Sequence, residues 1–237
     1  MKKFLFLFLL VALPALAYEV FQYNELPSNK IHTNDERLLF IIDFSQSMNE
    51  SVNGESKASM VQSVLRNFVP QIPSHIPIGL RVYGHKCGLT AYHACKASEL
   101  VVPIGINRQK EIFSHMNNLR PRGMTPITYS LKQAVAEDFG DYSGMKHIVL
   151  FTDGGENCDE SPCKYAIELS KLRKDFVIDV IAFNIGDEDD LDQLECTALV
   201  TKGEFYQAET KAELINILDK ILEKQKSVDA KILPSSY

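Results

Sequence analysis

The sequence contains none of the short motifs that mark the commonest hydrolases and nucleotide-binding enzymes. Its 237 residues include no GxSxG, no P-loop GxxxxGK[ST] and no HExxH, and its six histidines show no ligand spacing. These absences remove the simplest arguments for a serine hydrolase, a nucleotide hydrolase or a zinc peptidase. We therefore expect a protein that is not an enzyme.

The chain also lacks an excess of basic residues. It has 25 Lys and Arg against 31 Asp and Glu, which gives a formal charge of −6 at pH 7. Because phosphate contacts need clustered positive charge, this balance argues against a nucleic acid as the partner.

No apolar run is long enough to cross a membrane. The N-terminal run from Phe4 to Ala17 has 14 residues, whereas a spanning helix needs about 20. It follows two lysines and ends in the small-x-small sequence Ala15-Leu16-Ala17, which is the three-part pattern of a secretory signal peptide. We expect cleavage after Ala17, no membrane span in the product, and export to the periplasm or the medium of a bacterium.

Removing residues 1–17 leaves 220 residues and two fewer lysines, so the formal charge becomes −8. This length suits one large α/β domain. No internal repeat is visible, and residues 18–36 and 227–237 show no hydrophobic periodicity. We therefore expect a leader at 18–36, one domain at 37–226 and a tail at 227–237.

All five cysteines lie in the exported part of the chain. In an oxidising compartment they predict two disulfides and one free thiol, which allows fifteen arrangements. Short separations favour Cys87–Cys95 and Cys158–Cys163 as local loops, and a bond between Cys163 and Cys196 on neighbouring helices is the main alternative. A zinc site is disfavoured because the sequence has no CxxC pair.

Strand-like and helix-like segments alternate along residues 37–226. Strands are expected at Arg37–Phe44, Ile78–Tyr83, Glu99–Ile104, the apolar run ending at Asp153, Phe176–Phe183 and Glu204–Gln207. A cysteine-containing loop without a helix joins the second strand to the third, so the third is expected to be an antiparallel edge. The pattern predicts a doubly wound α/β fold, with a mostly parallel sheet and helices on both faces.

Six helices are expected between these strands. They are Ser59–Val69, a helix capped by Asn107, Ile127–Asp138, a helix opened by Ser161-Pro162, Asp190–Val200, and a helix opened by the capping box Thr210–Glu213. The inner face of the fourth is expected to carry Tyr165, Leu169 and Leu172.

Two aspartates, Asp43 and Asp153, each end a strand-like apolar run. An acid at the carboxyl end of such a strand emerges where open α/β sheets place their ligand sites. Hydroxyl residues Ser45 and Ser47 follow the first aspartate, and Thr125 adds a third hydroxyl from a separate loop. These five oxygen-bearing side chains, without His or Cys, predict a site for Mg²⁺ or the similar octahedral ion Mn²⁺.

The motif Asp43-x-Ser45-x-Ser47, the lone Thr125 before a proline and Thr152-Asp153-Gly154 resemble the metal-ion-dependent adhesion site of von Willebrand factor type A domains. The resemblance covers roughly residues 37–226 and implies a divalent cation above a doubly wound sheet. It implies that the three hydroxyls approach the metal directly, that the two acids act partly through water, and that an Asp or Glu of a partner protein completes the coordination shell. The expected function is a cation-dependent protein-binding module.

Two other classes of function stay open. Asp43 could be a phosphotransferase-type nucleophile, although the haloacid dehalogenase pattern expects a second acid where Ser45 stands. The metal could instead only stabilise an envelope-structural or assembly protein.

Weaker signals lie nearby. The basic residues His85, Lys86 and Arg122 could line the rim of the metal site, although basic loop residues are more often simply solvated. The acids between Asp187 and Asp192 resemble a second cation site, but a helix N-terminus attracts acids through its dipole alone.

Overall fold

A computed structural model describes residues 36–230, with side chains for 36–224, and it confirms the predicted α/β fold. The central sheet has six strands in the order β5-β4-β1-β6-β7-β8. Their bounds are β1 (Glu36–Asp43), β4 (Ile78–Tyr83), β5 (Ser98–Gly105), β6 (Met145–Thr152), β7 (Phe176–Phe183) and β8 (Phe205–Ala208). All neighbouring pairs are parallel except β4 and β5, so β5 is the predicted antiparallel edge.

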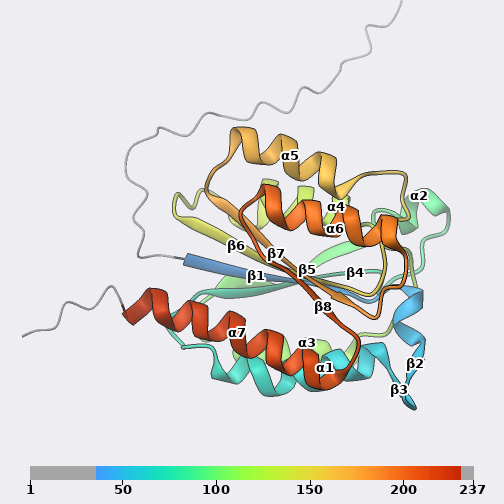
Figure 1. Cartoon of the computed structure of the whole chain (residues 1–237), viewed down its shortest axis with the longest axis horizontal. Helices are drawn as coiled ribbons and strands as arrows, with labels where there is room; N and C mark the ends of the chain where they lie inside the picture. The colour runs from blue at the N-terminus through green and yellow to red at the C-terminus, as the bar shows by residue number, and fades with distance from the viewer. Residues whose placement is uncertain (1–35, 231–237) are drawn as a thin grey trace, which may run out of the picture.

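Helices cover both faces of this sheet. Figure 1 shows α1, α3 and α7 on one face and α4, α5 and α6 on the other. Their bounds are α1 (Lys57–Phe68), α2 (Ala91–Ala94), α3 (Gln109–Asn118), α4 (Ile127–Gln133), α5 (Pro162–Leu172), α6 (Glu188–Val200) and α7 (Lys211–Ala230). A π-helical turn at Ala134–Asp138 continues α4, so the expected helix at 127–138 is present with a change of winding.

Strand β1 is buried on both of its faces, which explains why its sequence is an unbroken apolar run. Leu38, Phe40 and Ile42 pack in the core under α1, α3 and α7, whereas Leu39 and Ile41 pack in the core under α4, α5 and α6. Since successive side chains of a strand point to opposite faces, a strand covered on both faces needs apolar residues at every position. The run ends at Asp43, where the strand leaves the sheet.

The order of the strands reverses between β1 and β6. From β1 the chain moves outward to β4 and β5, and it then returns to β6 on the other side of β1. Open α/β sheets bind their ligands at such a switch point, outside the carboxyl ends of the strands. Asp43 ends β1 and Asp153 directly follows β6, so both acids lie at this point.

A buried charged group lies near the opposite end of the sheet. The imidazole of His147 on β6 contacts Asp179 on β7 through Nε2 at 2.8 Å and Glu36 on β1 through Nδ1 at 2.9 Å. Burial would lower the pKa of His147, but the hydrogen bonds to the two carboxylates outweigh burial and raise its pKa to about 9. The charged histidine thus ties three adjacent strands together.

Two local predictions were wrong. Asn107 does not cap α3, because it has a φ of 59° and Arg108 is the N-cap residue. Asn tolerates the left-handed region better than most residues, so it forms the turn before the helix instead. Leu172 is 62 % exposed rather than inward-facing, since it is the last residue of α5 and no further turn continues the apolar stripe.

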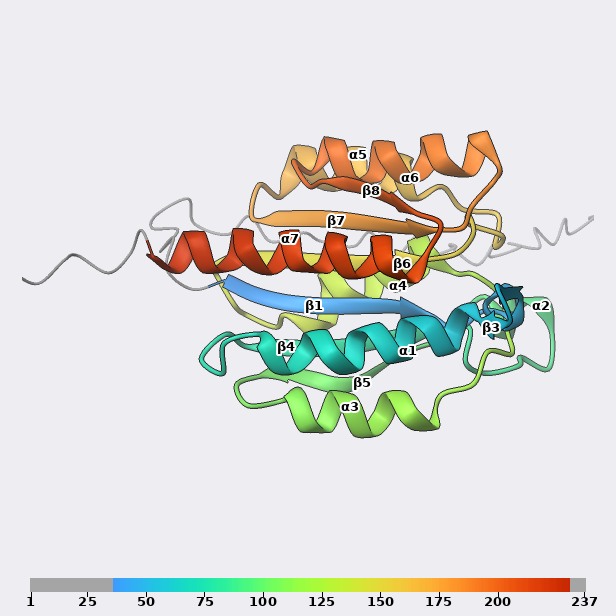
Figure 2. The same ribbon diagram turned by 60° about the horizontal axis from the view of Figure 1, so that its bottom comes forward.

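The loops at the carboxyl edge contain structure that the sequence did not reveal. A short antiparallel hairpin, β2 (Ser51–Val52) and β3 (Glu55–Ser56), precedes α1. The loop between β4 and β5 was expected to contain no helix, and this was wrong, because the one-turn helix α2 lies in it. Figure 2 shows the hairpin and α2 at the end of the molecule toward which β1 points. The expected signal peptide at 1–17 lies outside the described residues, as does most of the leader and of the tail. Within residues 36–230, no helix is long and apolar enough to cross a membrane.

Candidate metal centre

The carboxylate of Asp43 is held in a fixed orientation at the tip of β1. It is fully buried, and its two oxygens accept different hydrogen bonds. Oδ1 accepts the backbone N–H of Ser45 at 2.6 Å, and Oδ2 accepts the hydroxyl of Thr152 on the adjacent strand at 2.9 Å. The first bond turns the chain back over the strand end, so that the following hydroxyls lie above the sheet.

The hydroxyls of Ser45 and Ser47 link the two strand tips. Their Oγ atoms lie 3.0 Å apart, and Ser47 Oγ donates to Asp153 Oδ1 at 2.7 Å. Ser45 and Asp153 are both buried. The structure therefore joins four of the five expected site residues in one chain of hydrogen bonds, although Asp153 lies 106 residues from Ser47 in the sequence.

Thr125, the fifth expected residue, lies in a loop whose backbone contacts the Ser45 loop, but in the described part of the chain no hydrogen bond joins Thr125 itself to the other four site residues. The N–H of Gln46 donates to the carbonyl of Gly123 at 2.9 Å, and Ser45 and Gly123 form an isolated parallel bridge. On its other side, the N–H of Thr125 donates to Asn157 Oδ1 at 2.7 Å. The Thr125 loop is thus held between the Ser45 loop and the segment after Asp153.

A close backbone approach at Gly84 makes this arrangement possible. Gly84 follows β4 with a φ of +70°, and its carbonyl accepts the N–H of Gly123 at 2.7 Å. A Cβ at this position would lie 2.5 Å from the nitrogen of Ser45. Only glycine avoids both the clash and the strained dihedral, so the loop after β4 can lie directly against the site.

Two charged residues at the site were not identified from the sequence. The ammonium of Lys57, the first residue of α1, lies 3.0 Å from Asp153 Oδ2 and 2.8 Å from Glu50 Oε2. Burial opposes the charged form of Lys57, but Glu50 and Asp153 outweigh it and raise the lysine pKa. A lysine in the first turn of a helix is unfavourable, because the helix dipole places positive charge at that end. This mismatch is the sequence signal that could have identified Lys57.

The two aspartates repel one another in a buried setting. Burial first, and then the charge of Asp153, raise the pKa of Asp43 well above its usual range. Burial likewise raises the pKa of Asp153, which Ser47 and Lys57 partly oppose. A bound cation would relieve this cost, because it favours the charged form of both carboxylates.

The residues present fit a hard divalent cation. Asp153 Oδ2 is buried and makes no hydrogen bond of good geometry among the described residues, although it faces the Lys57 ammonium. Hydroxyl and carboxylate oxygens are the ligands that Mg²⁺ and Mn²⁺ prefer. Across residues 36–230 no group of three or more His, Cys, Asp or Glu could hold a metal, so an ion here would depend on the hydroxyls.

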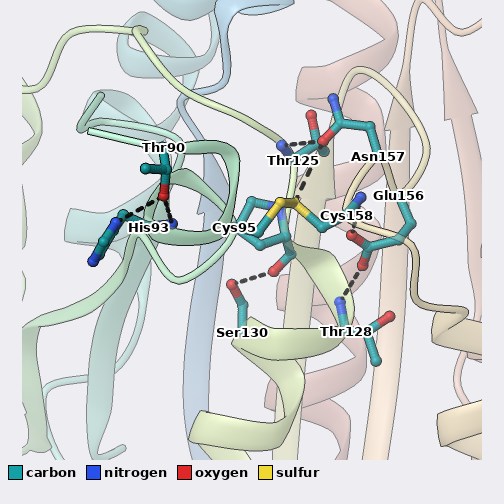
Figure 3. Close-up of a disulfide and its surroundings, with 10 residues drawn as sticks. Thr90, His93, Cys95, Thr125, Thr128, Ser130, Glu156, Asn157 and Cys158 are labelled. Atoms are coloured by element: carbon teal, nitrogen blue, oxygen red, sulfur yellow. Dashed lines mark hydrogen bonds between the residues drawn. A yellow bond between two sulfur atoms is a disulfide. The ribbon is translucent and has the colours of Figure 1, made fainter. Parts of the chain in front are cut away.

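A disulfide connects the loops around this centre. Cys95, at the end of α2, bonds to Cys158, five residues after Asp153, with a Cα–Cα distance of 5.6 Å (Figure 3). The second disulfide joins Cys163 on α5 to Cys196 on α6, as the interhelical alternative predicted, and Cys87 is an exposed free thiol. The two local pairs were wrong. Cys95 and Cys158 meet because their loops lie together at one edge of the sheet, and Cys163 and Cys196 meet because α5 packs against α6.

The carboxylate of Glu156 also braces this loop. Its Oε1 accepts the N–H of Cys158 at 3.0 Å, and its Oε2 accepts the N–H of Thr128 in the first turn of α4 at 2.7 Å (Figure 3). Together with the disulfide, these bonds fix the segment that carries Asp153 to the start of α4.

Four of the weaker candidates, two basic and two acidic, make local contacts. His85 Nε2 lies 3.1 Å from Glu99 Oε2, and Lys86 contacts the same carboxylate. Asp187 caps α6, and Asp190 accepts the N–H of Gly155 at 3.0 Å, which helps to anchor the loop after Asp153. Of the acids at this helix start, Asp187 therefore acts as a cap and Asp190 as a loop anchor.

Comparison with known proteins defines the class. The model of the von Willebrand factor type A domain family matches residues 38–156, so the chain belongs to this family. Two relatives come from Bacillus subtilis (strain 168). The uncharacterized protein YwmC is 28 % identical over 75 % of this chain and 78 % of its own, and the uncharacterized protein YwmD is 27 % identical over 80 % and 86 %.

Solved structures share the fold at lower identity. The von Willebrand factor type A structure from Catenulispora acidiphila has a TM-score of 0.64 at 16 % identity, over 81 % of this chain and 42 % of that one. The domain of the pilus tip protein Mfa5 from Porphyromonas gingivalis has a TM-score of 0.63 at 15 % identity, over 86 % and 98 %. Proximal thread matrix protein 1 of the mussel byssus, solved with a zinc-occupied adhesion-site motif, has a TM-score of 0.62 at 16 % identity, over 81 % and 46 %. This chain thus spans less than half of the first and last of these proteins.

Proposed function

We propose that this chain is an exported binding module that uses a divalent cation, Mg²⁺ or Mn²⁺, to recruit an acidic side chain of a partner protein. The observation that carries the proposal is the hydrogen-bonded chain from Asp43 through Ser45 and Ser47 to Asp153, placed at the switch point of the sheet. In the metal-bound protein Ser45, Ser47 and Thr125 would be direct ligands, and the two aspartates would act partly through water.

The donor set explains why a partner's acid is the expected ligand. Neutral hydroxyls leave most of a cation's charge unquenched, and such an ion attracts a further anionic oxygen. The cation supplies a fixed positive charge at the surface, and the chain supplies its position. Solved proteins of this fold include a pilus tip protein and a byssus matrix protein with zinc at its adhesion-site motif, which supports a role in protein attachment.

Export has independent support. Two disulfides within one domain are typical of an oxidising compartment. Together with the expected signal peptide at 1–17, they favour the periplasm or the exterior of a bacterium.

The test separates recognition from a purely structural metal. Immobilised protein is exposed to an envelope extract of its source organism with Mg²⁺, with EDTA, and with EDTA followed by excess Mg²⁺, beside the Ser45→Ala/Thr125→Ala variant. The proposal expects one retained protein that is lost with EDTA, recovered with Mg²⁺ and absent from a variant of unchanged thermal stability. Retention that ignores the chelator would contradict it, and a variant that unfolds generally would favour the structural role.

A further inference from the structure

The side chain of Lys57 occupies a position that is unfavourable for a lysine on two counts. It is 4 % exposed, and it lies at the first residue of α1, where the helix dipole repels a cation. A buried ammonium is stable only with partners, and here those partners are Asp153 and Glu50. Asp153 is one of the acids expected to serve the metal.

The hairpin formed by β2 and β3 is what brings Lys57 to the site. Its strands pair Ser51 with Ser56, and Glu50 and Lys57 are the next residues outward on either side. Glu50 contacts Lys57 through both its backbone and its side chain. The Glu50 carbonyl accepts the Lys57 N–H at 2.9 Å, and Glu50 Oε2 lies 2.8 Å from the Lys57 ammonium. The hairpin therefore returns the chain to the strand tip with a positive charge facing Asp153.

The two oxygens of Asp153 are divided between the hydroxyl chain and this ammonium. Oδ1 accepts the hydroxyl of Ser47 at 2.7 Å, and Oδ2 faces Lys57 at 3.0 Å. Asp43 and Asp153 would offer a divalent cation two buried negative charges. The buried ammonium of Lys57, which also contacts the largely exposed Glu50, offsets part of this charge. Charges this close in a desolvated site interact strongly.

We propose that Lys57 is a built-in competitor of the divalent cation: it stabilises the metal-free site and lowers its metal affinity. The inference rests on the proposed function, in which these residues hold a metal. It adds that this chain neutralises the bound cation less than it would without the charge of Lys57. A partner's carboxylate therefore gains more from binding to it.

Three variants test the inference by calorimetric titration of the purified protein with Mn²⁺ and with Mg²⁺. Lys57→Met keeps the length of the buried side chain without its charge, and metal affinity should rise at least about tenfold. Glu50→Gln, a largely exposed change, releases Lys57 from its second partner and should weaken metal binding several-fold. Lys132→Met, which removes a surface lysine paired with Glu160, is the control and should leave affinity unchanged.

Thermal stability gives a second readout. In EDTA, Lys57→Met should melt below the wild type, because Asp153 loses its counter-charge, and saturating Mn²⁺ should close or reverse this gap. A lysine that only packs would lower both melting temperatures equally, which would overturn the inference.

The results separate the two proposals. A wild type that binds no divalent cation contradicts the proposed function. A wild type that binds the cation while Lys57→Met binds it equally or more weakly overturns the role of Lys57 alone. If Lys57→Met does not fold, unchanged or tighter metal binding by Glu50→Gln would overturn it instead.

Discussion

The Cys95–Cys158 disulfide should hold the metal centre together as well as the fold. It ties the loop that follows α2 to the segment that carries Asp153, whereas the Cys163–Cys196 bond links two helices on one face of the sheet. Replacing each pair with alanines separates a disulfide at the site from one remote from it.

The two replacements should cost nearly the same stability. The disulfides close segments with sequence separations of 63 and 33 residues. Loop-closure entropy then gives about 4.3 kcal/mol for Cys95–Cys158 and about 3.7 kcal/mol for Cys163–Cys196 at 25 °C. Their effects on metal binding should differ, because loss of Cys95–Cys158 alone releases the loop after Asp153.

Urea denaturation and Mn²⁺ titration of both double variants measure these quantities. We expect similar losses in the free energy of unfolding, weaker Mn²⁺ binding in Cys95→Ala/Cys158→Ala, and wild-type affinity in Cys163→Ala/Cys196→Ala. Equal metal affinity in the two variants, at matched stability, would refute the idea that the first disulfide orders the site.

Three further predictions concern single residues. Protonated His147 stabilises the fold fully below about pH 6.5, and this contribution is lost as the pH rises to its pKa of about 9, so the free energy of unfolding should fall by about 3 kcal/mol between pH 6.5 and 9. An equal fall in His147→Gln, measured by urea denaturation, would contradict this. Gly84→Ala should lower the free energy of unfolding by at least about 2 kcal/mol and weaken Mn²⁺ binding, since its Cβ meets the Ser45 nitrogen and its φ is positive; wild-type behaviour in both assays would show that the loop relaxes. Asn157→Ala leaves the Thr125 N–H without its acceptor, so stability should fall by about 1–3 kcal/mol and Mn²⁺ affinity with it; a loss of stability with unchanged affinity would remove Asn157 from the account of the site.

Local sequence patterns predicted the parts of this protein that depend on neighbouring residues. The apolar runs ending at Asp43 and beside Asp153 specify strands buried on both faces, and βα alternation places such strands side by side in a parallel sheet. The positions of the Ser45 and Ser47 hydroxyls were also predictable, because these residues come two and four positions after Asp43, where the chain turns over the end of β1.

Contacts between distant loops were not predictable in the same way. Lys57 reaches Asp153 because a two-residue-per-strand hairpin folds back over the site. The pair Asn53-Gly54, in which both residues have a positive φ, is a sequence signal for the turn, but it does not say which side chains the hairpin brings to the site. The Cys95–Cys158 disulfide, with a sequence separation of 63, was also not predictable. Which thiols bond depends on how closely the folded loops approach one another and not on their separation in the sequence. Asn107 shows a smaller version of the problem, because the same residue type serves as a helix cap or as a left-handed turn.

An anomalous difference map from crystals grown with Mn²⁺ would locate the ion itself. We expect one strong peak at direct-coordination distance from the hydroxyls of Ser45, Ser47 and Thr125, with Asp43 and Asp153 around it. No peak at this point, or a peak whose ligands exclude Thr125, would contradict this expectation.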